Sequence, residues 1–121
     1  MDPAIAEGIR LFNSRRFFEA HEALEALWLL ERGDEKLFLH GLIQVAAAFH
    51  HYQRENWEGF RSLLVKGSTK LAQFSETRGG DIDIPDFLKQ IQPWLAASEA
   101  SGLSSTLPLP VIRTLGGRSI S

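Results

Sequence analysis

The sequence lacks several features that would assign a protein to a common function class. It contains no cysteine, which excludes disulfide bonds, thiolate metal sites and cysteine nucleophiles. Its formal net charge is −2, whereas dedicated nucleic-acid binders are usually strongly basic. Its apolar stretch at residues 37–49 is too short to span a bilayer and is interrupted by His40 and Gln44. Asp2 and Glu7 interrupt the region where a secretory signal would be apolar. We therefore expect a soluble, cytoplasmic protein that binds neither nucleic acid nor a membrane.

The sequence does contain helical periodicity along most of its length. Its 121 residues are 44% hydrophobic and 23% charged, which is enough for one domain with a packed core. Apolar residues at three- and four-residue steps predict helices at about 3–13, from 17 to a break at Gly33-Asp34, at 35–54, from 57 to a loop at 77–84, and at 85–101. We expect an all-α, single-domain bundle of about five helices, built from antiparallel hairpins, at residues 1–102. A short extended C-terminal arm, residues 103–121, is expected to pack on its own core or on a neighbour.

The helix expected at 35–54 is apolar on most of its circumference, which is typical of a central helix packed on several sides. Gly41 lies inside it, where glycine lowers helix propensity by about 1 kcal/mol relative to alanine. We therefore expect a second helix to cross closely at Gly41.

A weak internal repeat is visible when the sequence is offset by forty residues. The offset aligns Phe12 with Tyr52, Phe17 with Trp57 and Leu24 with Leu64. Two related helical hairpins would produce these matches, and so would two unrelated amphipathic hairpins.

Polar residues are threaded through the apolar surface of two expected helices. On the helix from residue 17 they share one face with two aromatic residues, and on the helix at 35–54 they form a second stripe. The residues are Phe18, His21, Glu25 and Trp28, then His40, Gln44, Ala47 or Ala48, and His51. Antiparallel packing would bring His21 towards His51, Glu25 towards Gln44, and Trp28 towards His40. We expect an interhelical polar layer flanked by Phe18 and Trp28, both mostly buried.

Three interpretations of this layer remain open. In the first, its members satisfy one another and fix which helices pair, so that Glu25→Ala would destabilise the fold by about 1–3 kcal/mol. In the second, His21, Glu25 and His51 are weak candidate ligands of a divalent metal such as zinc, iron or nickel. The segment reads H-E-x-x-E, however, and lacks the second histidine of the zincin motif. In the third, a histidine poised by Glu25 belongs to an acid/base or ligand-binding cleft.

Two segments resemble the small helical family known as domain of unknown function 309. They are Leu11-Phe12-Asn13 with FFEAHEALEALW, and GLIQVAAAFHH with Asn56, within roughly residues 9–71. The resemblance implies a helical bundle and no established activity, and its motifs match at Phe18, Glu19, Ala20, His21, Glu22, Leu24, Glu25, Trp28, Gly41, Leu42, Ile43, Gln44, His51, Asn56 and Gly59. The sequence departs from the family pattern at Arg15 and Glu55, where glycine is usual, and at His40, where glutamine is usual. The first two departures indicate strained or rebuilt turns.

The functional expectation combines the layer with this resemblance. We expect a non-enzymatic binding or interaction module whose ligand is an unidentified protein or small molecule. The candidate functional residues are His21, Glu22, Glu25, Trp28, Gln44, His51 and Asn56. The alternative is a metal-dependent or acid/base hydrolase that uses the same histidines and glutamates. No cofactor is predicted, although a divalent metal stays open, as does a homo-oligomer formed through the C-terminal arm.

Overall fold

The computed structural model describes residues 2–74, 81–99 and 107–115, and it is all-helical apart from one isolated β-bridge. The elements follow in the order α1 (Pro3–Asn13), α2 (Phe17–Trp28), α3 (Gly33–Gln53), α4 (Trp57–Ala72) and α5 (Ile84–Ala97). The expected all-α bundle of five helices is confirmed. Among the described residues, no helix is long and apolar enough to cross a membrane.

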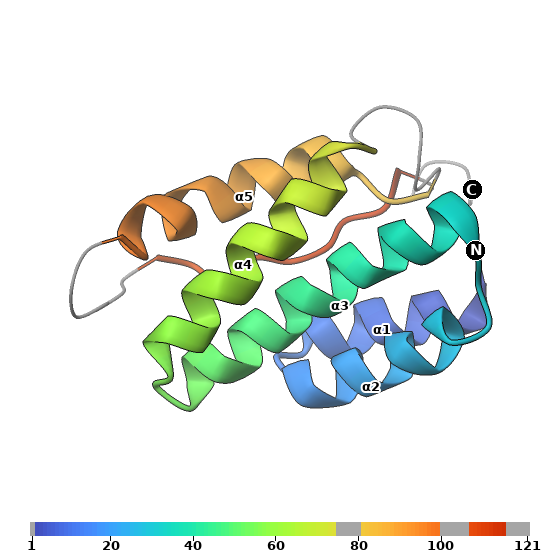
Figure 1. The fold of residues 1–121 in the computed structure, drawn as a ribbon, viewed down its shortest axis with the longest axis horizontal. Helices are drawn as coiled ribbons and strands as arrows, with labels where there is room; N and C mark the ends of the chain where they lie inside the picture. The colour runs from blue at the N-terminus through green and yellow to red at the C-terminus, as the bar shows by residue number, and fades with distance from the viewer. Residues whose placement is uncertain (1, 75–80, 100–106, 116–121) are drawn as a thin grey trace.

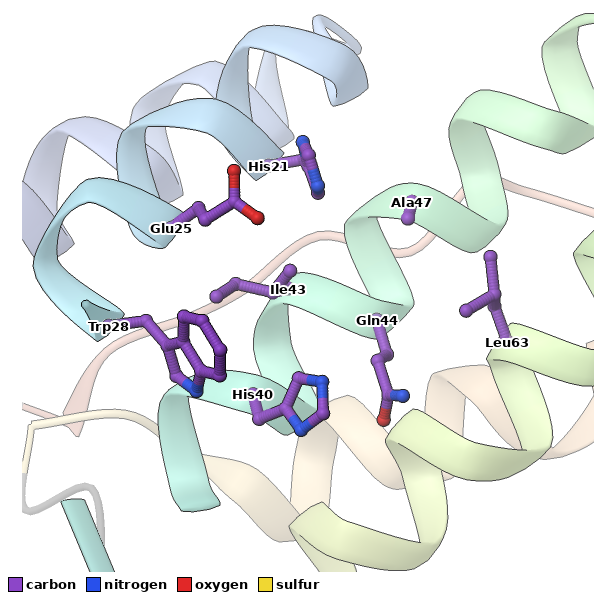
Figure 2. A pocket seen from close by; sticks show the side chains of 8 residues that line it. All are labelled: His21, Glu25, Trp28, His40, Ile43, Gln44, Ala47 and Leu63. Atoms are coloured by element: carbon purple, nitrogen blue, oxygen red, sulfur yellow. The ribbon is translucent and has the colours of Figure 1, made fainter. Parts of the chain in front are cut away.

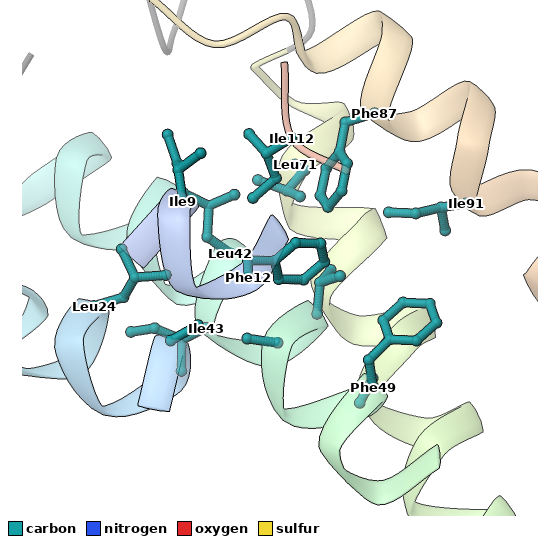
Figure 3. Packing of buried hydrophobic residues seen from close by; sticks show 14 of the residues in the cluster. Ile9, Phe12, Leu24, Leu42, Ile43, Phe49, Leu71, Phe87, Ile91 and Ile112 are labelled. Carbon is teal, nitrogen blue, oxygen red and sulfur yellow. The ribbon is translucent and has the colours of Figure 1, made fainter. Parts of the chain in front are cut away.

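Helix α3 is the centre of the bundle, as its apolar circumference predicted. It packs against α2 on one side and α4 on the other, while α1 packs on α2 and α5 on α4 (Figure 1). All five helices contribute aromatic rings to the core, and these rings pack mostly edge to face. Phe12 and Phe49 lie among them (Figure 3). Because α3 is covered on several sides, only a narrow stripe of its surface stays accessible between α2 and α4.

Side-chain caps explain several of the helix starts. Asp2 accepts a hydrogen bond from the Ala4 N–H at 2.7 Å, next to Pro3 at the first helical position, as predicted. The prediction for the start of the third helix was wrong, because α3 begins at Gly33 with Arg32 as its N-cap residue. Asp34 lies instead in the first turn, where its negative charge suits the positive end of the helix dipole.

The turns α1–α2 and α3–α4 have the same backbone structure at an offset of forty residues. Arg15 has a φ of 67° and Glu55 a φ of 61°. After each of them, the next N–H returns to the carbonyl five residues earlier, from Arg16 to Leu11 and from Asn56 to His51, both at 2.9 Å. This is the Schellman helix ending, which glycine usually completes. The turns are therefore strained at these two positions, as the resemblance implied, and the repeat seen in the sequence extends to backbone geometry.

The expected close crossing at Gly41 is confirmed. A Cβ atom added at Gly41 would lie 3.0 Å from Leu71 and 3.2 Å from the Gly67 carbonyl oxygen. A Cβ added at Gly67 would lie 2.8 Å from Val45 and 2.9 Å from the Gly41 carbonyl oxygen. Helices α3 and α4 therefore meet backbone to backbone at two facing glycines.

The described part of the C-terminal arm, residues 107–115, packs on its own chain. The Asn13 side-chain amide exchanges hydrogen bonds with the Ile112 backbone at 2.9 and 2.7 Å. The Gln90 amide does the same with Val111 at 3.0 and 2.9 Å, and the Trp94 indole donates to the Pro108 carbonyl. Helix α5 ends at Ala97, before the expected residue 101. The expected boundary at 102/103 and residues 77–80 of the expected loop at 77–84 lie outside the described residues.

Candidate functional site

A cavity of about 200 Å³ opens over α3 between α2 and α4. Its lining residues come from all three helices: His21, Glu25 and Trp28 from α2, His40, Ile43, Gln44 and Ala47 from α3, and Leu63 from α4. Figure 2 shows the α2 side chains reaching towards α3, with the Trp28 and His40 rings at one end of the cavity. We call this cavity the α3 cleft.

The cleft unites much of the polar layer predicted from the sequence. It contains four of the predicted site residues, His21, Glu25, Trp28 and Gln44. The expected approach of Trp28 to His40 is confirmed, since their ring centroids are 5.4 Å apart. Antiparallel pairing of α2 with α3 is sufficient to explain these placements.

Two apolar lining residues were not predicted. Ile43 lies on α3 close to the polar stripe, where apolar periodicity gives it a core role rather than a site role. Leu63 belongs to α4, and its place at the cleft depends on how this third helix packs over α2 and α3. Spacing put either Ala47 or Ala48 on the polar stripe; Ala47 lines the cleft, whereas Ala48 is buried in the core.

The polar residues of the cleft do not satisfy one another. His21 Nδ1 and Gln44 Oε1 are buried and have no hydrogen-bond partner in the described part of the chain. Glu25 is exposed, and within the same residues no hydrogen bond or ion pair involves it. A self-satisfied structural network among His21, Glu25, Gln44 and His51 is therefore not what the fold contains. His21, Glu25 and Gln44 line the cleft, and within the described residues no hydrogen bond joins any two of them.

His51 and Asn56 belong to the α3–α4 turn rather than to the cleft. The Asn56 side-chain oxygen accepts a hydrogen bond from the Gly59 N–H at 3.1 Å, so its amide nitrogen faces His51 as a donor at 3.0 Å. His51 Nδ1 therefore accepts, which places the ring proton of neutral His51 on Nε2. His51 is thus directed to this turn and does not line the cleft, and its expected approach to His21 stays a prediction.

His50 takes the place that His51 was expected to have beside α2. The centroid of the His50 ring lies 5.1 Å from that of Phe18, whose own ring stacks on His21 at 5.9 Å. One residue along a helix turns the side chain by about 100°, which explains the exchange of roles between two adjacent histidines. Phe18 was expected to be mostly buried, but it is 45% exposed because it lies on the outer edge of α2. Trp28 is partly buried.

The geometry bears on the metal interpretation as well. Among the described residues, no three histidine, aspartate, glutamate or cysteine side chains are grouped so that they could hold a metal ion. His51, the third ligand considered with His21 and Glu25, is held by Asn56 in the turn. Glu22 is exposed and does not line the cleft.

Two groups decide the electrostatics of the cleft, the carboxylate of Glu25 and the imidazole of His40. Burial lowers the pKa of His40 below its usual value, and the positive charge of Lys70 lowers it further, so His40 is mostly neutral at pH 7. Burial is also the main cause of the lowered pKa of His50. Glu25 therefore supplies the formal negative charge of the lining, and no ion pair within the described residues offsets it.

A second hollow of about 320 Å³ adjoins the cleft at the start of α3. It is lined by Trp28, Gly33, Lys36, Leu37 and His40, so the Trp28–His40 pair belongs to both. The Lys36 ammonium lies 4.5 Å from the centroid of the Trp28 ring, a cation–π contact. Together the two hollows extend along the accessible stripe of α3.

Comparison with known proteins supports the resemblance noted in the sequence. No curated protein matches the chain. A family model described as a domain of unknown function, DUF309, matches residues 5–63, from α1 into α4. This range includes every residue that lines the α3 cleft. Over residues 5–63 the chain is therefore similar to the DUF309 family, in agreement with the resemblance carried by its motifs.

Proposed function

We propose that this protein is a non-enzymatic binding module whose ligand occupies the α3 cleft. The observation that carries the proposal is a pair of buried polar atoms, His21 Nδ1 and Gln44 Oε1, beside a cavity of about 200 Å³; neither atom has a hydrogen-bond partner among the residues that the structure describes. A buried polar group left without a hydrogen bond costs about 1–3 kcal/mol. A ligand that supplies hydrogen bonds to both atoms recovers this free energy only in the bound state.

The dimensions of the cleft favour a small occupant. Pockets for drug-sized ligands measure about 300–1,000 Å³. At about 200 Å³ the α3 cleft suits a small molecule or a single side chain of a partner. Its lining combines Trp28, Ile43 and Leu63 with a few polar side chains, the composition usual for binding sites.

A fragment screen read by NMR tests this proposal. The protein has three indole N–H groups, and each gives its own signal. Trp28 lines the cleft, whereas Trp94 is buried and hydrogen-bonded to Pro108, and Trp57 lies at the start of α4. The indole signal that disappears in Trp28→Phe is that of Trp28, and Trp94→Phe identifies the Trp94 signal in the same way. We expect fragments that bind the cleft to shift the Trp28 signal and to leave the Trp94 signal unchanged.

A pair of variants supplies the control for the screen. Ala47→Leu fills the cleft without removing a polar group and should abolish the fragment-induced shifts of Trp28. Ala96→Leu adds the same atoms at an exposed site on α5 and should retain them. Fragments that never shift Trp28, or that shift it equally in both variants, would contradict the proposal.

An acid/base hydrolase is the second candidate, because a neutral imidazole and a carboxylate line the same cleft. The lowered pKa leaves His40 able to accept a proton at pH 7, and Glu25 is free to orient a substrate. Hydrolysis of a panel of p-nitrophenyl esters, measured for the parent and for His40→Gln, tests it. A rate that exceeds the uncatalysed rate and falls in the variant would favour the enzyme over the binding module.

A further inference from the structure

We infer that the group bound in the α3 cleft is a small cation that carries several hydrogen-bond donors, an ammonium or a guanidinium. This inference rests on the proposed function and adds the chemical class of the ligand. Its basis is that the same small cavity is lined by an aromatic ring, by a carboxylate and by two buried polar atoms. Within the described residues, neither the carboxylate nor the two buried atoms have a hydrogen-bond partner.

The first argument is charge. Apart from its two histidines, the cleft lining contains one ionisable residue, Glu25, and the lowered pKa of His40 keeps that imidazole neutral at pH 7. The neighbouring cations are Lys36, over the Trp28 ring in the adjoining hollow, and Lys70, near His40; neither lines the cleft. An anion bound here would face the Glu25 carboxylate, whereas a cation would neutralise it.

The second argument is the inventory of donors and acceptors. The Glu25 carboxylate and Gln44 Oε1 accept hydrogen bonds, and His21 Nδ1 accepts one whenever the ring proton is on Nε2. A guanidinium carries five N–H donors and an ammonium carries three, and neither carries an acceptor. Hydrogen bonds between an ionised donor and a carboxylate are roughly twice as strong as those between neutral groups. A donor-rich cation therefore matches what the cleft leaves unpaired.

The third argument is the Trp28 ring. The indole attracts cations over its face, and in this protein it already holds the Lys36 ammonium 4.5 Å from its centroid. Trp28 forms one end of the cleft, beside His40 and close to the Glu25 side chain on the same helix (Figure 2). Aromatic surface and a carboxylate on one wall are the combination that recognises organic cations.

Three probes matched in size test the inference through the indole signal of Trp28. They are ethylguanidinium, the neutral isostere ethylurea, and the anion butanoate, each titrated at low ionic strength. We expect ethylguanidinium to bind about tenfold more tightly than ethylurea, because the charge adds both cation–π attraction and charge-assisted hydrogen bonds. Butanoate should bind most weakly.

Two variants locate the charge that is responsible. Glu25→Gln keeps the size of the side chain and removes its charge, so the preference for ethylguanidinium over ethylurea should fall to about one, while ethylurea binding changes little. Glu22→Gln alters the exposed neighbour on the same helix and should keep the preference. A preference that survives in Glu25→Gln, or that is lost equally in both variants, overturns the inference.

The outcomes separate this inference from the proposed function. If ethylurea or butanoate shifts Trp28 as strongly as ethylguanidinium, the cleft binds ligands but the assignment to a cation is wrong. If no probe and no screened fragment shifts Trp28, the binding function itself fails. The source of the cation is decided by a capped pentapeptide with one central arginine and its citrulline counterpart. Tighter binding of the arginine peptide than of ethylguanidinium identifies a protein side chain, and weaker binding identifies a free small molecule.

Discussion

Glu25 has a different role in the structure from the one that helical spacing suggested. The spacing placed it inside an interhelical network, whereas the side chain is exposed at the edge of the α3 cleft and, within the described residues, has no partner. His21 and Gln44 are held beside it with one buried atom each unpaired. These three side chains leave hydrogen-bonding capacity unused, while the helices that carry them are packed in the bundle. This combination is common at functional sites.

The residue-scale prediction is that Glu25→Gln leaves stability almost unchanged. No hydrogen bond or ion pair is lost in the described part of the chain, so the free energy of unfolding should stay within about 0.5 kcal/mol of the parent. Thermal and urea unfolding of Glu25→Gln, beside Glu22→Gln, measure this. A loss above about 1 kcal/mol for Glu25→Gln alone would restore the structural network.

Between elements, the facing glycines of α3 and α4 set the distance at which these helices cross. Gly67 is the tighter of the two, since an added Cβ would meet the Gly41 carbonyl oxygen at 2.9 Å and the Val45 backbone nitrogen at 3.0 Å. Backbone atoms of a central helix cannot move aside as a flexible side chain can. The crossing also fixes Leu63 over the cleft, so the glycines support the site from a distance.

We predict that Gly67→Ala destabilises the protein even though alanine is the better helix former. Overpacking costs about 1–3 kcal/mol and higher propensity returns up to about 1 kcal/mol, so a net loss of about 1–2 kcal/mol is expected. Urea denaturation measures it. Ser62→Ala on the exposed face of α4 is the control and should be neutral or slightly stabilising. Equal stabilisation by both changes would mean that the crossing of α3 and α4 accommodates an added methyl group at Gly67.

For the whole molecule, pH should couple to stability through His40 and His50. Burial lowers the pKa of both imidazoles in the folded protein below the ordinary value of 6.5, so the unfolded chain takes up protons first as the pH falls. Nearby cations add to the effect, Lys70 at His40 and Arg54 at His50. Their contribution to stability is present above pH 6.5 and declines as the pH falls towards the folded-state pKa values.

The corresponding prediction concerns the double variant His40→Gln/His50→Gln. Between about pH 7 and about pH 5.5 the parent should lose stability, and the variant should lose less because two of the groups that take up protons on unfolding are gone. Thermal midpoints across this range measure the slopes. Parallel slopes for the two proteins would show that other groups cause the acid sensitivity.

The sequence by itself determined the features that depend on local periodicity and turn chemistry. Apolar spacing located the helices, Asp2-Pro3 marked the first start, and Gly41 marked the close crossing. The departures from the family pattern at Arg15 and Glu55 indicated two strained turns, and both residues have a positive φ. These features follow from neighbouring residues, because helix formation and helix endings are decided within a few positions along the chain.

Only the tertiary structure decided which side chains share the site. A rotation of about 100° per residue separates His50, beside Phe18, from His51, in the turn with Asn56, whereas helical spacing had put His51 in the polar stripe and His50 one step off it. The packing of α4 brought Leu63 to the cleft. Within the described residues, His21 Nδ1 and Gln44 Oε1 have no hydrogen-bond partner, and whether such a bond forms depends on differences of tenths of an ångström between helices. The periodicity of the sequence predicts which side of a helix packs on the core. The exact rotation of the helix about its axis, and its distance from the neighbouring helices, are set by every neighbour that it packs against.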